Sequence, residues 1–436
     1  MKRLLVVAYY FPPSGGAGVQ RVLKWVKYLR DFSVEPTVLT VEAGAYPKTD
    51  ATLARDVPDG LAVHRTRSLD PFGAYARLTG RSRQQAVAET SGHLGSDTSG
   101  AERFARWVRA NVFVPDARVG WVPFAVQRGL HLLRDEPFDA VLTSGPPHSV
   151  HLTGWALRAR TGIPWIADFR DPWTDINYYD ELPRTAAVHA TDRWLERRVL
   201  EQADRVITVS PGWRDLLLGK VERDPADFAV IHNGFDPDDF GPGQAPPEDR
   251  FTLVYVGSLY GSRNPDALWR AVASLRTRGK APKLRLRLVG RIGADVMAML
   301  GAHGLDAVTE HVPYVPHDEA VREMQRASAL LLTVESYRHE RGNLTGKVYE
   351  YLAAGRPIVA LGPVEGDAAD LLRDTEAGRM LDRDDADSVA EHLRMLYAAW
   401  ECGDALNGAS AAAAAPYSRR AETAELAAVL DDLVTA

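Results

Sequence analysis

The sequence is poor in cysteine and has no long apolar run. Its one cysteine, Cys402, excludes an intramolecular disulfide and a zinc site built from cysteines, and it fits a reducing compartment. No stretch approaches the ~18 consecutive apolar residues that a membrane-spanning helix needs. A net charge of -6 gives no support for nucleic-acid binding. We therefore expect a cytoplasmic protein with no nucleic-acid partner.

The sequence also lacks a clear secretory signal. The opening residues MKRLLVVAYYFPP have a short apolar run that ends in Pro-Pro without a cleavage site, so a buried first strand is the better interpretation. What the chain does contain is typical of a globular protein, with 45% hydrophobic and 25% charged residues. Its 436 residues exceed one ordinary core, which predicts two domains.

The first half follows the pattern of a doubly wound α/β domain. Leu4–Tyr10 is a continuous apolar run of the kind found in central parallel strands. The loop FPPSGGAG, a helix with one apolar face and a second strand at Thr37–Val41 complete a βαβ unit. Residues 86–101 are rich in Ser, Gly and Thr and predict a mobile insertion. Further strands are expected at Ala140–Thr143, Trp165–Asp168 and Arg205–Val209.

A break in this pattern separates two halves of comparable size. Residues 241–250, GPGQAPPEDR, combine Pro, Gly and charge without periodicity and predict a linker. The pattern restarts with a strand at Phe251–Gly257 and a helix at Pro265–Arg278. We expect a first domain over residues 1–240 and a second over residues 250–415, with ligands at the C-terminal ends of the strands.

The densest signal is the stretch from Gly342 to Gly362, GNLTGKVYEYLAAGRPIVALG. It combines a loop of small residues, a short helix for which Thr345 can act as N-cap, a stop at Gly355 and an apolar strand. A helix N-terminus at Thr345–Gly346 attracts phosphate oxygens through its unpaired N–H groups and its dipole.

The helix itself carries two charges on one face. Lys347 lies beside the helix N-terminus and adds a cation for phosphate, and Glu350 follows at i+3. A carboxylate can accept two hydrogen bonds side by side from a pair of sugar hydroxyls. Phosphate at the tip of the helix and a hydroxyl pair one turn deeper predict a site for a nucleoside diphosphate.

This stretch resembles the nucleotide-sugar segment of the retaining glycosyltransferases of family four, which have the GT-B fold. In that family a Glu, seven residues and a second Glu lead into Ala-x-Gly-x-Pro, and the second Glu corresponds to Glu350. Further similarity spans nearly the whole chain, in ITVSPGWRDLL, IHNGFDPDDF and LVYVGSLYGSRNPDAL. The resemblance implies two Rossmann-like doubly wound domains that face each other across a cleft. It also implies a tail helix, about 418–436, packed back on the first domain.

The chain departs from the family at three positions that would contact the donor. The first Glu of the pattern is replaced by Gly342, while Glu335 and Glu340 lie nearby but out of register. Ser258 stands where the family has an Arg, and Arg263 corresponds best to a later Lys of the family. A guanidinium can bind two diphosphate oxygens at once. The alternative for Arg263 is a solvated side chain on a loop.

Two glycines after the first strand, Gly16 and Gly18, suggest a dinucleotide loop. The third glycine position is Arg21, which argues against a tight NAD site. In the family this loop faces the cleft and approaches the donor phosphates and the acceptor. A plain strand-to-helix turn is the alternative.

Two further candidates follow strands of the first domain. His148 corresponds to a histidine that the family places close to the reacting carbon, and a structural histidine is the alternative. We expect no metal at His148 and His151, because no carboxylate or third His shares their spacing. Asp171 can act as a base that accepts the proton of the acceptor hydroxyl, or it can belong to an ion-pair cluster with Asp168 and Arg170.

Two segments bear on the ligands and partners. Tyr314 and Val315 follow a strand in HVPYVPHDE, and the backbone there is expected beside the base of the nucleotide. Residues 103–109 are basic and aromatic, which predicts a surface helix packed on the core. A second interpretation of this segment is peripheral contact with the inner face of a membrane or with a lipid-linked acceptor.

The resemblance implies an enzyme that moves a sugar from a nucleoside-diphosphate donor to a hydroxyl of a small-molecule, glycan or lipid-linked acceptor, with retention at the anomeric carbon. The sugar nucleotide is a co-substrate, and no other cofactor and no metal are expected. Arg263 and Lys347 would balance the charge of the leaving diphosphate. Two alternatives are a GT-B relative with another reaction, such as epimerisation or pseudo-glycosyl transfer, and a nucleotide-sugar-binding partner protein without turnover.

Overall fold

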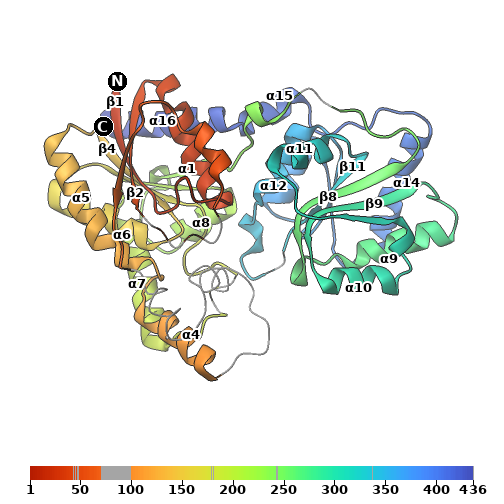
Figure 1. Ribbon diagram of the computed structural model, residues 1–436, viewed down its shortest axis with the longest axis horizontal. Helices are drawn as coiled ribbons and strands as arrows, with labels where there is room; N and C mark the ends of the chain where they lie inside the picture. Colours follow the sequence, from red (N-terminus) through yellow and green to blue (C-terminus); the bar gives the residue numbers. More distant parts are fainter. Residues whose placement is uncertain are drawn as a thin grey trace. The chain divides into compact units, whose positions relative to one another are not determined.

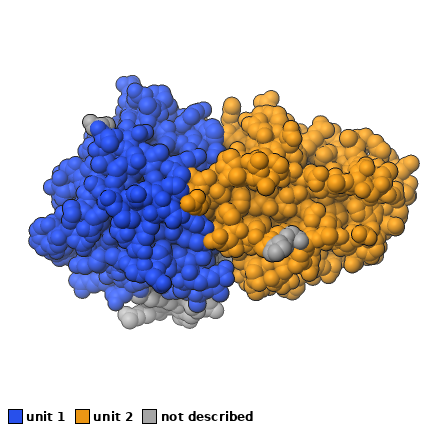
Figure 2. All heavy atoms as spheres, turned by 90° about the horizontal axis from the view of Figure 1, so that it is seen from above, with its two compact units in different colours: residues 1–232, 422–436 blue, residues 233–421 orange. Residues whose placement is uncertain are grey.

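The structure is a computed structural model that describes residues 1–42, 44, 46, 49–69, 100–177, 179, 181–241, 244–335 and 337–435. Of the predicted insertion at 86–101, residues 86–99 lie outside this description. The chain divides into two compact units, residues 1–232 with 422–436, and residues 233–421 (Figure 2). Each unit is a parallel sheet with alternating helices (Figure 1), which confirms the predicted α/β class.

The described part of the first unit forms a seven-stranded parallel sheet in the order β3-β2-β1-β4-β5-β6-β7. The order reverses between β1 and β4, so the loops that follow these two strands leave the C-terminal edge of the sheet at its switch point. The strands are β1 (Lys2–Val7), β2 (Val34–Val41), β3 (Ala62–Thr66), β4 (Ala140–Gly145), β5 (Trp165–Phe169), β6 (Arg205–Thr208) and β7 (Phe228–Val230).

Helices cover both faces of this sheet, because alternate residues of the central strands are apolar on both sides. Leu4 and Val6 of β1 share a core with α1, whereas Leu5 and Val7 share the opposite core with α5 and α6. The last helix, α16, adds Leu426 to the core on the α1 side. The helices are α1 (Ala17–Tyr28), α4 (Gly100–Val112), α5 (Val122–Asp135), α6 (Ser149–Thr161), α7 (Ala186–Gln202), α8 (Pro211–Leu218) and α16 (Arg419–Thr435).

The described part of the second unit forms a six-stranded parallel sheet in the order β10-β9-β8-β11-β12-β13. Its order reverses between β8 and β11, which makes this pair the switch point of the second sheet. The strands are β8 (Phe251–Leu259), β9 (Leu284–Ile292), β10 (Thr309–Val312), β11 (Ala329–Thr333), β12 (Ile358–Leu361) and β13 (Gly378–Leu381).

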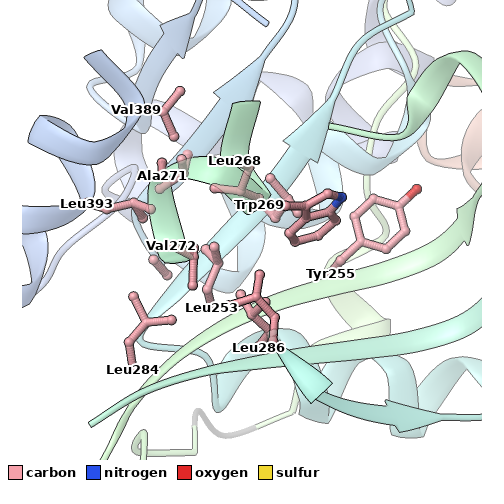
Figure 3. Close-up of a cluster of buried hydrophobic side chains, with 14 of the residues drawn as sticks. Leu253, Tyr255, Leu268, Trp269, Ala271, Val272, Leu284, Leu286, Val389 and Leu393 are labelled. Atoms are coloured by element: carbon pink, nitrogen blue, oxygen red, sulfur yellow. The ribbon is translucent and has the colours of Figure 1, made fainter. Parts of the chain in front are cut away.

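The second sheet is also buried on both faces. Leu253 and Tyr255 of β8 face α9 and α14 (Figure 3), whereas Val254 and Val256 pack with α11, α12 and α13. This explains the apolar run Leu253–Val256 within β8. The helices are α9 (Asp266–Thr277), α10 (Ala294–Ala302), α11 (His317–Gln325), α12 (Gly346–Ala354), α13 (Asp367–Asp374), α14 (Ala386–Glu401) and α15 (Ala411–Ala414).

Helix α12 begins and ends where the sequence predicts. Thr345 is its N-cap residue, and Gly355 ends it in the left-handed conformation with φ 66°. The hydroxyl of Thr345 makes no capping hydrogen bond with any described residue. The N–H of Val348 donates to the carbonyl of Thr345, whereas no partner is found among the described residues for the N–H groups of Gly346 and Lys347, which suit an anion.

Candidate active site

The candidate donor residues gather at the C-terminal edge of the second sheet. Ser258 lies at the end of β8, and Arg263 lies in the turn that follows it. Lys347 and Glu350 belong to α12, which follows β11, the neighbour of β8 at the switch point. The edge of the sheet thus brings together two segments that are far apart in the sequence, as expected for open parallel sheets.

The ammonium group of Lys347 is held by the end of β8. Its Nζ donates to Tyr255 Oη at 2.8 Å, and Tyr255 Oη in turn donates to the carbonyl of Ser258 at 2.7 Å. Lys347 Nζ also lies 4.7 Å from the centroid of the Tyr255 ring. A Cβ on Gly257, whose φ is 129°, would lie 2.3 Å from Lys347 Cε. The lysine therefore needs a glycine at this position of the strand.

Arg263 lies in an ion pair and beside an aromatic ring. Its Nε is 3.1 Å from Glu335 Oε1, and its Cζ is 6.0 Å from the centroid of the Tyr260 ring. Arg291, at the end of β9, lies 5.9 Å from the same ring centroid and is exposed. Lys347, Arg263 and Arg291 thus all lie at the C-terminal edge of this sheet, and Arg291 was not predicted from the sequence.

Glu350 is partly buried on α12. Burial raises the pKa of its carboxyl above the usual value, and the nearby His317, Lys347 and Arg419 oppose this shift. Among the described residues no hydrogen bond or ion pair to Glu350 is found. A carboxylate in this state can accept hydrogen bonds from a ligand.

Tyr314 and Val315 follow β10, at the outer side of the same sheet. Tyr314 is 68% exposed, whereas Val315 packs against the core that α12 shares. Their contact with a base stays a prediction.

In the first unit, Gly16 and Gly18 lie in the loop between β1 and α1. Gly16 precedes α1 with φ 95°, and a Cβ there would meet nothing within 4 Å. The carbonyl of Gly18 accepts a hydrogen bond from Arg170 Nη1 at 2.6 Å. Gly16 therefore faces space that no described residue occupies, whereas Gly18 is hydrogen-bonded to the loop after β5.

Asp168, Arg170 and Asp171 have different surroundings. Asp168 is fully buried and pairs with Arg21 at 3.0 Å, so it is structural. Arg170 donates to the backbone carbonyls of Gly145 and Pro146 and ties the β4 loop to the β5 loop. Asp171 is partly buried, and no hydrogen bond to it is found in the described ranges.

Burial raises the pKa of Asp171, with a further contribution from Asp168 and an opposing one from Arg170. A raised pKa makes a carboxylate a stronger base, which suits proton transfer from a hydroxyl. Both interpretations that the sequence leaves open for Asp171 stay predictions.

His148 lies on the N-terminal side of α6, at its cap position. Its ring stacks on Trp173 with centroids 5.0 Å apart and planes at 10°, and it is 7% exposed. Neither ring nitrogen has a hydrogen-bond partner among the described residues. Burial, His151 and Arg170 hold the pKa of His148 well below its usual value, so the ring is neutral.

His151 has a structural role. Its Nδ1 lies 2.9 Å from Thr143 Oγ1, and its ring stacks on Phe169 with centroids 4.6 Å apart. Burial and Arg170 lower its pKa to about 3. Among the described residues no group of three or more His, Cys, Asp or Glu could hold a metal ion.

The basic, aromatic segment forms α4, but its packing differs from the prediction. Trp107 is 45% exposed instead of packed on the core. Burial lowers the pKa of Arg109 to about 10, with Arg118 and Arg184 contributing. The helix is anchored near its end by Asn111, which donates to the carbonyl of Pro183 and accepts from Thr185 N–H. No helix in the described ranges is long and apolar enough to cross a membrane.

Two side chains that contact the candidates, Tyr255 and Trp173, were missed from the sequence, and Glu335 was named there only as lying near the family pattern out of register. Glu335 forms an ion pair with Arg263, Tyr255 accepts a hydrogen bond from Lys347, and the ring of Trp173 stacks on His148. A signal was available for Glu335 and Trp173, because both follow shortly after a strand on the edge where ligands bind. Tyr255 lies inside β8, and the apolar sequence around it indicates only that its side chain is buried.

Comparison with known proteins gives a consistent family. Residues 15–234 match the glycosyl transferase 4-like domain, and residues 250–399 match the glycosyl transferases group 1. A D-inositol 3-phosphate glycosyltransferase of Nocardioides sp. is 30% identical over 226 residues, which cover 46% of this chain and 47% of that protein. The protein of that name from Mycobacterium avium is 28% identical over 239 residues, with 51% and 53% covered. The chain spans about half the length of the curated relatives it matches.

Two solved structures resemble the whole chain. Sucrose-phosphate synthase from Thermosynechococcus elongatus has a TM-score of 0.65 at 14% identity and covers 100% of both chains. Anabaena HepE in complex with UDP and glucose has a TM-score of 0.63 at 14% identity, covering 99% of this chain and 100% of that one. At these identities the likeness concerns the fold, which is that of GT-B glycosyltransferases.

Proposed function

The chain belongs to the glycosyltransferases that combine a glycosyl transferase 4-like domain with a group 1 domain, and from this premise we propose its reaction. The protein transfers a sugar from a nucleoside-diphosphate donor to an acceptor hydroxyl, with retention of anomeric configuration. The observation that carries the proposal is the group of Lys347, Arg263 and Glu350 at the C-terminal edge of the second sheet.

Each of these groups has a part in binding the donor. The N-terminus of α12 and Lys347 bind the diphosphate, and Arg263 adds a second cation that can reach two oxygens. Their charges balance the negative charge that grows on the diphosphate as the glycosidic bond breaks, without a metal ion. Glu350 accepts hydrogen bonds from the ribose hydroxyls.

The first unit supplies the groups for the acceptor. Asp171 takes the proton of the attacking hydroxyl, which its raised pKa supports. His148 is neutral and buried, and its ring nitrogens can exchange hydrogen bonds with a substrate hydroxyl. The loop at Gly16 leaves room for a ligand, because no described residue lies within 4 Å of a Cβ placed there.

The acceptor class is suggested by the relatives. Several curated relatives are named D-inositol 3-phosphate glycosyltransferases, so a phosphorylated polyol is the first acceptor to test. Glycan and lipid-linked acceptors follow, since the exposed Trp107 of α4 could contact a lipid.

The decisive experiment identifies the donor first. A thermal-shift screen with UDP, GDP, dTDP and ADP finds the nucleotide, because a ligand that binds only the folded state raises the Tm. The matching sugar nucleotides are then incubated with the protein, and the release of free sugar to water is followed. Slow release with retained configuration supports the transferase. Binding without release would favour a non-catalytic binding protein, and a changed sugar nucleotide would favour an epimerase.

A further inference from the structure

Glu335 is a buried carboxylate at the C-terminal edge of the second sheet that the proposed reaction does not use. It follows β11, and its side chain is 8% exposed. One oxygen, Oε1, lies 3.0 Å from Ser262 Oγ, which donates to it, and 3.1 Å from Arg263 Nε. Glu335 therefore contacts two successive residues of the turn that follows β8.

The guanidinium of Arg263 contacts Glu335 through one nitrogen. Its Nε lies 3.1 Å from Glu335 Oε1, no hydrogen bond from its terminal nitrogens is found in the described ranges, and its side chain is 33% exposed. A guanidinium has five N–H donors, of which four lie on the two terminal nitrogens. The ring of Tyr260 borders the guanidinium as well, at 6.0 Å from Cζ. Arg263 thus lies beside a carboxylate and an aromatic ring, and its side chain is partly exposed.

The neighbouring carboxylate, Glu340, does not share this task. Its Oε2 accepts a hydrogen bond from Tyr337 N–H at 3.1 Å, within its own turn. Gly342, where the family pattern has a Glu, offers no side chain at all. Within the described part of the segment between β11 and α12, Glu335 is the carboxylate that contacts Arg263.

We propose that Glu335 is a positioning residue, which fixes Arg263 so that its terminal nitrogens meet the diphosphate of the donor. This inference rests on the proposed function, because it assumes that Arg263 binds a diphosphate. Preorganisation of this kind improves binding, since the guanidinium loses less freedom when the ligand arrives.

For the removal of Glu335, the proposal and simple electrostatics predict opposite changes in the affinity for a diphosphate. A carboxylate near an anion-binding site repels the anion, so removing its charge should tighten diphosphate binding. If Glu335 positions Arg263, its removal should instead weaken binding. A purely structural role would lower the Tm and leave the affinity of the folded protein unchanged.

The test compares Glu335→Ala, Glu335→Gln and Arg263→Ala by calorimetric titration with UDP, or with whichever of GDP, dTDP and ADP stabilises the wild type most. Glu335→Ala should weaken binding about tenfold. Glu335→Gln keeps an oxygen acceptor for Ser262 and Arg263 and should lose less. Glu310→Ala is the matched control, because it removes a carboxylate that pairs with Arg287 on β9 and β10, away from the turn after β8.

The double variant decides whether Glu335 acts through Arg263. In the Arg263→Ala background, Glu335→Ala should have no further effect on affinity, because the group that it positions is gone. Additive losses, or tighter binding by Glu335→Ala, would overturn the inference while leaving the proposed function intact. If Arg263→Ala binds as the wild type does, or if none of the four nucleotides binds, the role given to Arg263 fails and the inference fails with it.

Discussion

At the scale of single residues, the two donor-side cations are restrained by different neighbours. Lys347 donates a hydrogen bond to the hydroxyl of Tyr255, and this hydroxyl donates in turn to the carbonyl of Ser258. Arg263 lies against a carboxylate instead. A lysine is a point charge on a flexible stem, whereas a guanidinium has a fixed donor geometry. We infer that Lys347 contributes mainly charge and that Arg263 contributes both charge and orientation.

Loss of Lys347 should therefore slow the reaction more than it perturbs the fold. One charge-assisted contact is worth roughly 1.5–3 kcal/mol, which corresponds to about one to two decades in rate. Lys347→Ala should reduce turnover of the sugar nucleotide at least tenfold at unchanged Tm. Lys280→Ala, an exposed lysine before β9, is the control and should behave as the wild type. Equal turnover in both variants would show that Lys347 has no part in catalysis.

We expect the ionised carboxylate of Glu350 to destabilise the fold while it favours nucleotide binding. Its pKa is raised in the folded state, chiefly by burial, so the folded protein binds the proton more tightly than the unfolded chain. The ionised carboxylate therefore destabilises the fold. This destabilisation is absent at low pH, and it grows as the pH rises from the pKa of Glu350 in the unfolded chain to its pKa in the folded protein. Removing the charge should stabilise the ligand-free protein only at the higher pH.

The variant Glu350→Gln tests both consequences. Without ligand, its Tm should exceed that of the wild type at pH 7 and match it at pH 4, where wild-type Glu350 is largely protonated. With nucleoside diphosphate, it should bind more weakly, because an amide presents one acceptor oxygen instead of two. A lower Tm at pH 7 would contradict the first expectation, and a slower turnover at unchanged affinity would make Glu350 catalytic instead.

Part of this site can be predicted from local sequence and part cannot. Lys347 and Glu350 share one helix, so their spacing alone places them together. The contact of Ser262 and Arg263 with Glu335 joins positions 73 and 72 residues apart, and His148 meets Trp173 across two neighbouring strands. Such pairs depend on which strand ends become neighbours, and no periodicity within one segment contains that information.

At the scale of elements, the ends of β8 and β9 depend on two glycines. Gly257 and Gly290 are paired across the strands, with φ of 129° and 115°. A Cβ on Gly290 would lie 2.3 Å from the carbonyl oxygen of Gly257. Both strands therefore need glycine where they reach the site, because the backbones and the Lys347 side chain occupy the space of a Cβ.

Gly257→Ala should consequently damage both stability and the site. The substitution combines an unfavourable φ, which costs of order 1–3 kcal/mol, with displacement of Lys347. Its control is Gly279→Ala after α9, which has φ 64° and nothing within 4 Å of an added Cβ, and which lies outside the turn of Ser262 and Arg263. Both variants should lower the Tm, but only Gly257→Ala should also weaken nucleotide binding. Equal affinities would mean that Lys347 can move without loss.

The elements themselves were predictable to different extents. Central strands such as β8 and β12 follow from the apolar runs Leu253–Val256 and Ile358–Leu361, because both faces of these strands are covered. The strands β3, β7 and β13 were not predicted. β3 and β7 lie at the two edges of the first sheet and β13 at one edge of the second, and each has five residues or fewer. A short edge strand carries too few apolar residues to stand out from a loop.

At the scale of the whole molecule, the chain enters the first unit twice. Residues 1–232 form most of it, and residues 422–436 return to it after the second unit is complete. Leu426 and Leu430 of α16 are fully buried in the core that α1 shares. Because these leucines come from the end of the chain, the first unit cannot complete this core until synthesis has passed through the second.

This connectivity predicts separate effects on the two units. Leu430→Ala should destabilise the first unit by about 2–5 kcal/mol, since it leaves a cavity in a fully buried core. Leu393→Ala on α14 is the matched variant, because it removes an equally buried leucine from the second unit. Scanning calorimetry should show a lower transition temperature for the first unit in Leu430→Ala and for the second unit in Leu393→Ala.

A nucleoside diphosphate should raise the transition temperature of the second unit and leave that of the first unit unchanged. If both variants lower one common transition, the two units unfold together and the donor site depends on α16 as much as on its own sheet.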